Sequence, residues 1–158
     1  MARQTPHPSA SGAGLAPVVV QSRDSARQFF FAVWAKHRQA RPLEPLERLV
    51  AEVIVLHPEY HALLDAGPQG RAVDYGNAAP EHNPFLHMGL HIALREQVAA
   101  DRPAGIARLH GLAIANAEQG HAAEHRMLDC LAEELWRAQS AGRLPDEQAY
   151  LSALRGLR

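Results

Sequence analysis

The sequence predicts an all-α protein: an up-and-down bundle of four to five helices with a short C-terminal helix and a disordered N-terminal tail. Apolar residues recur at helical spacing over most of the chain, and no segment shows the period of two that marks a strand. Alanine and leucine dominate the apolar residues, while aromatic residues make up only 6%. Such a composition favours helix over sheet.

The length of 158 residues suits one domain. The first 21 residues contain three prolines and a patch of small residues, so we expect residues 1–21 to form a disordered tail and residues 22–158 a single helical domain. Capping residues and prolines separate the periodic segments of that domain. The predicted helices cover about residues 22–37, 45–57, 85–99, 103–117, 118–139 and 145–154.

Charge and hydropathy argue against two classes of partner. The net charge is -1 and no basic run is longer than a pair, so we expect no binding to nucleic acid. No stretch approaches the ~20 apolar residues that cross a bilayer, so we expect no membrane partner. The single cysteine, Cys130, cannot form an internal disulfide. That predicts a reducing, cytoplasmic location.

Histidine is the unusual feature of the composition, with 10 residues in the chain. Placed on the predicted helices at about 100° per residue, six of them form pairs four residues apart on apolar faces. The pairs are His57/His61, His87/His91 and His121/His125, the first of them only if the helix continues through Pro58. Up-and-down packing would bring the three pairs to one depth, because each lies near the same end of the bundle.

Two histidines at positions i and i+4 are how one helix supplies two ligands to a metal ion. Six imidazoles exceed what one tetrahedral zinc ion needs, and Glu124 shares the face of His121 and His125. We therefore predict a dinuclear transition-metal site of hemerythrin-like or ferritin-like character, di-iron in the first instance, with zinc or manganese as alternatives. The predicted ligands are His57, His61, His87, His91, His121, His125 and Glu124. His110 faces the core singly and stays open as a ligand.

Two other interpretations come from the same residues. The protein could be a metal-free helical adaptor in which the histidines form a buried hydrogen-bonded network. Tyr150, Leu151 and Leu154 would then offer a docking face for a partner protein or for a second copy in a homo-oligomer. The string from His121 to His125 also matches the H-x-x-E-H motif of inverted zinc peptidases. Only 33 residues follow it, too few for the cleft and third ligand of such an enzyme.

Several longer motifs stand out in order along the chain. They are the segments Asp24 to Trp34, His57-Pro-Glu-Tyr-His61, Asn83 to His91, His121 to Trp136 and Pro145 to Leu151. Together they resemble a bacterial family, the domain-of-unknown-function family numbered 1841. The resemblance covers nearly everything after residue 22, implies a small helical protein of Gram-negative bacteria with histidines at the six paired positions, and brings no established activity.

Overall fold

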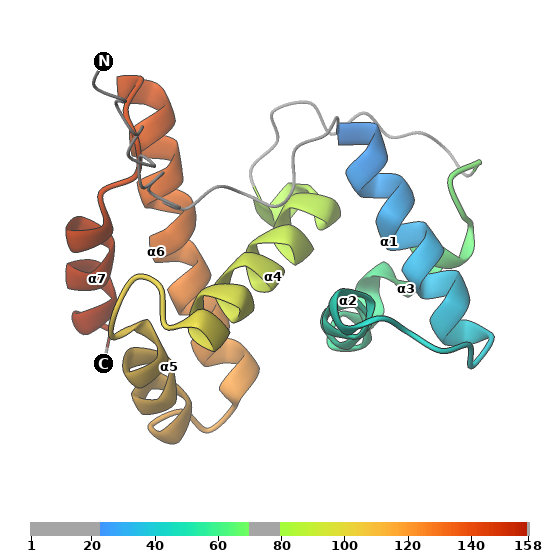
Figure 1. Ribbon diagram of the computed structural model, residues 1–158, viewed down its shortest axis with the longest axis horizontal. Coiled ribbons are helices and arrows are strands. Elements are labelled where there is room, and N and C mark those ends of the chain that lie inside the picture. The colour runs from blue at the N-terminus through green and yellow to red at the C-terminus, as the bar shows by residue number, and fades with distance from the viewer. Residues whose placement is uncertain (1–22, 70–79, 158) are drawn as a thin grey trace, which may run out of the picture.

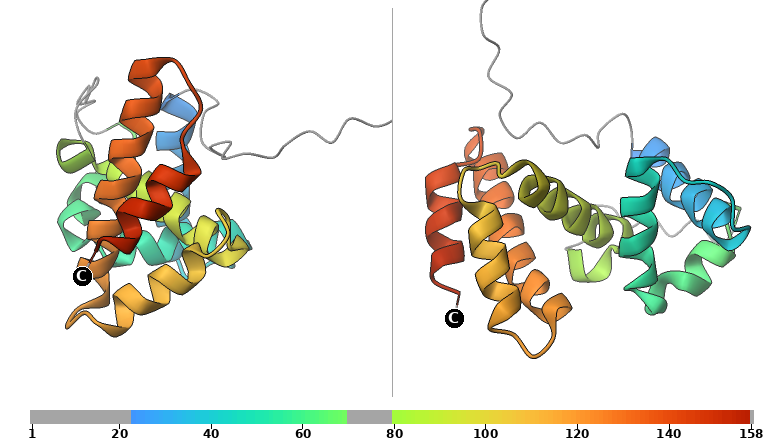
Figure 2. Two further views of the ribbon diagram at one scale, coloured as in Figure 1. Left: turned by 90° about the vertical axis from the view of Figure 1, so that its left-hand side faces the viewer. Right: turned by 60° about the horizontal axis from the view of Figure 1, so that its bottom comes forward.

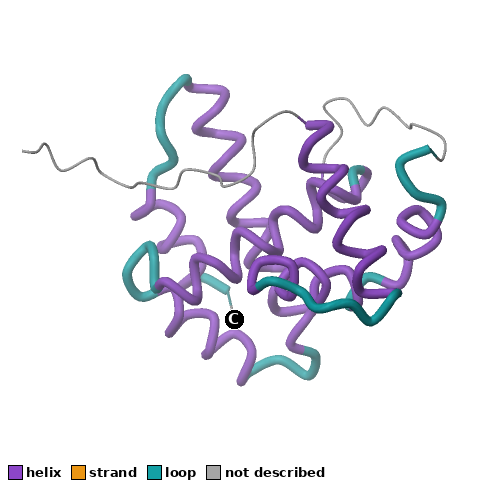
Figure 3. Tube along the Cα trace, turned by 45° about the vertical axis from the view of Figure 1, so that its right-hand side comes forward, coloured by secondary structure: helices purple, strands orange, loops and turns teal. Residues whose placement is uncertain are grey.

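The computed structural model describes residues 23–69 and 80–157, so the predicted tail, residues 1–21, lies outside the described residues. The all-α prediction is confirmed: the described part of the chain holds seven α-helices, two short 3-10 turns and no strand (Figures 1 and 3). The elements are α1 (Arg23–Arg38), α2 (Pro45–Val55), η1 (Pro58–Tyr60), α3 (His61–Asp65), η2 (Pro80–His82), α4 (Pro84–Ala100), α5 (Ile106–Ala115), α6 (Gly120–Ala141) and α7 (Glu147–Arg155).

The helices pack in two groups that share α4. Helices α1, α2 and α3 lie on one side of α4, and α5, α6 and α7 lie on the other (Figures 1 and 2). Each group has its own apolar core. The first core contains Phe30, Val33, Trp34, Val50, Ala51, Val53, Ile54, Leu64, Met88 and Ile92. The second contains Leu90, Leu94, Ile106, Met127, Leu128, Leu131, Tyr150, Leu151 and Leu154.

Helix α4 serves both cores because it carries two apolar faces. Met88 and Ile92 enter the first core. Leu90 and Leu94 enter the second, since they lie roughly 200° further around the helix. His87 and His91 fall in the sector between these faces. The histidines of α4 therefore lie where the two groups of helices meet.

Local signals set the helix ends near the site. The Asn83 side chain accepts a hydrogen bond from the backbone N–H of Leu86 at 3.1 Å, and Pro84 follows at the first helical position. Helix α2 ends at Val55, and the next turn begins at Pro58. Proline lacks a backbone N–H and disfavours helical geometry in the residue before it. The helix does not continue through Pro58, so the condition on which the His57/His61 pair depended is not met.

The apolar face of the C-terminal helix, α7, packs into the protein's own core. Tyr150, Leu151 and Leu154 are all buried against the second core. They are not available as the docking face that the adaptor interpretation expected. Among the described residues, no helix combines the length and the hydropathy needed to span a membrane.

Candidate metal centre

Five imidazole rings meet between the two groups of helices. His57 comes from the break after α2, His87 and His91 from α4, and His121 and His125 from α6. Their ring centroids lie close together, at 4.2 Å for His121 and His125 and at 4.7 Å for His57 with either His91 or His121. The cluster thus joins three segments that are far apart in the sequence.

Four of these residues point a ring nitrogen at a common space. One ligand atom from each of His57, His91, His121 and His125 lies within 4.8 Å of the corresponding atom of every other. His57 and His91 are completely buried, whereas His121 and His125 are half-buried. The fifth histidine, His87, adjoins this group, with its Nε2 at 3.1 Å from Nε2 of His57.

The backbone fixes how the His57 ring is presented. Its Nδ1–H donates to the carbonyl oxygen of Val53 at 2.7 Å, one turn back in α2. Because Nδ1 carries the proton, Nε2 keeps its lone pair and faces the other rings. In this state the Nε2–H of His87 donates to that lone pair. A metal ion bound by His57 would have to displace this hydrogen bond.

Glu124 orients His91 from behind. One carboxylate oxygen accepts from Nδ1–H of His91 at 3.2 Å and from Arg95 at 3.1 Å, and the other accepts from Nε2–H of His110 at 3.3 Å. Burial would raise the pKa of Glu124, but the hydrogen bonds from His110, His91 and Arg95 outweigh burial and hold the pKa well below its usual range. The resulting carboxylate–histidine pair leaves Nε2 of His91 as a lone-pair donor, as in many metal sites.

Three buried nitrogens of the cluster have no hydrogen-bond partner. They are Nε2 of His91, Nδ1 of His121 and Nε2 of His125. Buried polar atoms in proteins are nearly always paired, because an unpaired one costs about 1–3 kcal/mol. Three such atoms in one place mark the cluster as a candidate binding site.

Four histidines of the cluster, His87, His91, His121 and His125, have a pKa below the ordinary value, which favours the neutral form. Burial, and then repulsion from the neighbouring imidazoles, lowers the pKa of His87 and of His121 to about 4. Burial also lowers the pKa of His91, despite the opposing effect of Glu124, and that of His125. Neutral imidazoles keep a free lone pair at neutral pH, which is the form that binds metal ions.

The structure does not bring every predicted ligand into the cluster. His61 lies apart: its ring packs on Trp34 at a centroid distance of 4.5 Å, and its Nε2–H donates to the Ile54 carbonyl at 2.9 Å. The break at Pro58 turns it away from His57. Glu124 sits behind His91 and is occupied by three donors, and His110, left open from the sequence, belongs to this outer layer.

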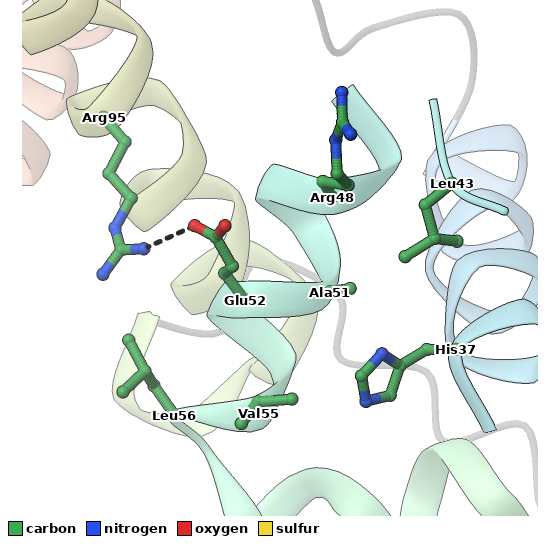
Figure 4. A pocket seen from close by; sticks show the side chains of 8 residues that line it. All are labelled: His37, Leu43, Arg48, Ala51, Glu52, Val55, Leu56 and Arg95. Atoms are coloured by element: carbon green, nitrogen blue, oxygen red, sulfur yellow. Dashed lines mark ion pairs between the residues drawn. The ribbon is translucent and has the colours of Figure 1, made fainter. Parts of the chain in front are cut away.

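Two residues of the site, Arg95 and Tyr60, lie outside the set predicted from the sequence. Arg95 links Glu124 to Glu52 of α2, which it contacts at 3.7 Å (Figure 4). Its position four residues after His91 on α4 is the signal that places it on the same side of the helix. Tyr60 stacks on His57, with ring centroids 5.4 Å apart and planes 6° from parallel. No sequence pattern indicates that contact, because it depends on the break at Pro58.

A family model described as a domain of unknown function, DUF1841, matches residues 22–156. The chain belongs to this family. The resemblance seen in the sequence motifs is thereby confirmed. No curated protein and no solved structure matches this DUF1841 protein.

Proposed function

We propose that this DUF1841 protein binds a transition-metal ion through His57, His91, His121 and His125, with His87 adjoining as a displaceable fifth imidazole. One observation carries the proposal. Three buried imidazole nitrogens face a common space with lone pairs and without partners. Glu124 and the Val53 carbonyl support the ligands from outside by holding the protons of His91 and His57.

The donor set favours one ion over the two predicted from the sequence. The four donor atoms lie within 4.8 Å of one another, and the group contains no carboxylate. Ferritin-like pairs of ions are held by several carboxylates projecting into the bundle. Glu124, the predicted bridge, already accepts from three donors. The donor set therefore differs from a ferritin-like one, and a dinuclear centre remains the alternative that stoichiometry tests.

The charge of the surroundings bears on which ion is held. The lowered pKa of His87, His91, His121 and His125 favours neutral imidazoles. The negative charge of Glu124 is balanced by the positive charge of Arg95 at 3.1 Å. A buried ion would keep its full charge, so a divalent ion costs less to bury than a trivalent one. Imidazole suits zinc and ferrous iron, and manganese less well. We expect Zn(II) or Fe(II).

A metal-free histidine network is the competing function, and the hydrogen bonds argue against it. A network would pair its nitrogens, as His57 and His87 do at 3.1 Å. The unpaired atoms of His91, His121 and His125 do not behave in this way. Absence of metal uptake would restore the adaptor interpretation.

Metal content after reconstitution tests the proposal. The purified protein is incubated separately with Zn(II), anaerobic Fe(II) and Mn(II), desalted, and analysed by elemental mass spectrometry. We expect about one equivalent of Zn(II) or Fe(II) in the wild type and in His82→Ala, an exposed histidine outside the cluster. We expect less than about a tenth of an equivalent in His91→Ala/His125→Ala. Two equivalents would support the dinuclear alternative, and equal uptake by both variants would overturn the proposed ligands.

A further inference from the structure

A groove separate from the histidine cluster runs across the outer face of α2, between the end of α1 and the middle of α4 (Figure 4). Its volume is about 480 Å³, which falls within the range of small-molecule sites. The lining joins an apolar surface to charged groups. The apolar residues are Leu43, Ala51, Val55 and Leu56, and the polar residues are His37, Arg48, Glu52 and Arg95.

The apolar part of the groove is unusually open to solvent. Val55 is 48% exposed and Leu56 is 41% exposed, although both follow directly from the buried stretch of α2. Leu43 and His37 face Ala51 and Val55 across the groove (Figure 4). Exposed apolar side chains that line a concave surface, with charged residues around them, are typical of a binding site.

Among the charged side chains that line the groove, that of Arg48 forms no ion pair within the described residues. Two guanidinium groups line the groove, and only that of Arg95 is paired with the Glu52 carboxylate (Figure 4). Glu52 is largely exposed and contacts Arg95 at 3.7 Å, and Arg95 is already bonded to Glu124 on its inner side. The Arg48 side chain has no ion pair and no hydrogen bond to any residue that the structure describes. Its guanidinium is therefore available to pair with a bound anion.

We propose that this groove binds a medium-chain carboxylate, an anion with one charge and an apolar tail. The carboxylate would pair with the Arg48 guanidinium, whose planar fork suits two parallel hydrogen bonds. The tail would cover Ala51 and Val55 and reach toward Leu43 and His37. A single unpaired guanidinium suits a monoanion better than a phosphate group, which carries more charge. The proposal does not depend on metal binding.

The groove contains a built-in reporter. His37 lines it and stacks on Trp34, with ring centroids 5.4 Å apart. Trp34 itself is buried, whereas Trp136, the second tryptophan of the chain, is exposed on α6. A Trp136→Phe background leaves Trp34 as the single tryptophan. A ligand that moves the His37 ring should then change its fluorescence.

Titrations with three eight-carbon probes test the proposal in the full-length Trp136→Phe protein. Sodium octanoate has the proposed charge and tail, 1-octanol has the tail without the charge, and octyltrimethylammonium reverses the charge. We expect octanoate to bind about tenfold more tightly than octanol, and the cation not to bind. Short-chain acetate, which lacks the tail, should not bind either. Equal binding of octanoate and octanol would overturn the anion assignment.

Two substitutions locate the binding. Arg48→Gln should weaken octanoate about tenfold, and Val55→Asp should abolish its binding by placing a carboxylate in the tail site. Arg108→Gln is the matched control, because Arg108 is also exposed on a helix and makes no ion pair among the described residues. Circular dichroism checks that each variant folds. Unchanged octanoate affinity in Arg48→Gln and Val55→Asp, or a dimer in light scattering that Val55→Asp dissociates, would contradict the proposal.

Discussion

Helix α6 carries two buried carboxylates whose surroundings differ in one respect. Glu124 and Glu134 are 5% and 4% exposed, and hydrogen bonds lower the pKa of each. Glu134 accepts from Arg143 at 2.8 Å and from the backbone N–H of Asp146 at 2.6 Å. That set is closed. Glu124 instead leads through His91 to a cluster of nitrogens without partners.

The comparison separates a structural acid from a functional one. Glu134 ties the end of α6 to the segment that begins α7, where the Asp146 side chain caps the helix by accepting from Ala149 at 2.9 Å. None of the buried side-chain atoms without a partner among the described residues belongs to Glu134, Arg143 or Asp146. Glu124, by contrast, holds a histidine, His91, whose other ring nitrogen, Nε2, is buried without a hydrogen-bond partner. Buried charge alone therefore does not mark a site; incomplete pairing does.

The largest expected effect is metal-linked stability. With free zinc at a thousand times its dissociation constant, the free energy of unfolding should rise by about 4 kcal/mol, because the ion binds the folded state. Urea denaturation with and without zinc measures the rise. Glu134→Gln should show the same rise from a lower starting value. If His91→Ala/His125→Ala gained as much as the wild type, zinc would be acting elsewhere on the protein.

The next largest effect is expected on removing the hydrogen bonds that Glu134 accepts. Glu134→Ala leaves the Asp146 N–H and the Arg143 guanidinium without their acceptor. We expect a loss of about 2–3 kcal/mol in the free energy of unfolding, with metal content per folded chain unchanged. Urea denaturation and elemental analysis measure the two quantities together. A drop in metal content would mean that the two regions are not independent.

A smaller effect, on zinc affinity, is expected from substituting Glu124, which lies behind His91. Glu124→Gln keeps an oxygen that can accept from His91 but removes the charge that makes the imidazole a better ligand. Zinc affinity should fall about 10–100-fold, as for other residues that support metal ligands. Competition with a chromophoric chelator measures it. Unaltered zinc affinity in Glu124→Gln would show that the carboxylate does not support the site.

The free energy of unfolding should depend on pH in two ranges, one governed by the imidazoles of the cluster and a lower one governed by the buried carboxylates. In the metal-free protein the pKa values of His87 and His121 fall from 6.5 to about 4 on folding, so the unfolded chain binds more protons in this window. Stability should thus decline as the pH falls from 6.5 to 4, by at most about 1 kcal/mol per pH unit, given the partial exposure of these rings. The lowered pKa values of Glu124 and Glu134 act below pH 4.5.

Urea denaturation across this pH range separates the two contributions. His87→Gln/His121→Gln should flatten the decline above pH 4.5, and Glu134→Gln should flatten only the part below it. A decline above pH 4.5 that survives loss of both imidazoles would assign it to other groups.

The fold class and much of the cluster could be predicted from the sequence. Periodicity and capping residues are local, so they place the helices and put His87, His91, His121 and His125 on inward faces. The second apolar face of α4 could not be predicted in the same way. Met88 and Ile92 form a buried face only because the core of the other helix group packs against them.

The remaining differences depend on contacts between distant segments. Pro58 signals a break but not its direction, so the sequence alone did not separate His57 from His61. The three donors on Glu124 come from α4 and α5, and the pairing of Glu134 with Asp146 crosses from α6 to the start of α7. Such partners are fixed by packing, which helical spacing does not encode.

X-ray absorption at the zinc edge of the reconstituted wild-type protein tests the central claim most directly. The account predicts a first shell of nitrogen at about 2.0–2.1 Å with the multiple-scattering pattern of several imidazoles. Sulfur at about 2.3 Å would instead implicate Cys130, and a shell of oxygen without imidazole scattering would place the ion outside the histidine cluster. Either of those results would contradict the assignment of the open nitrogens at His91, His121 and His125 as metal ligands.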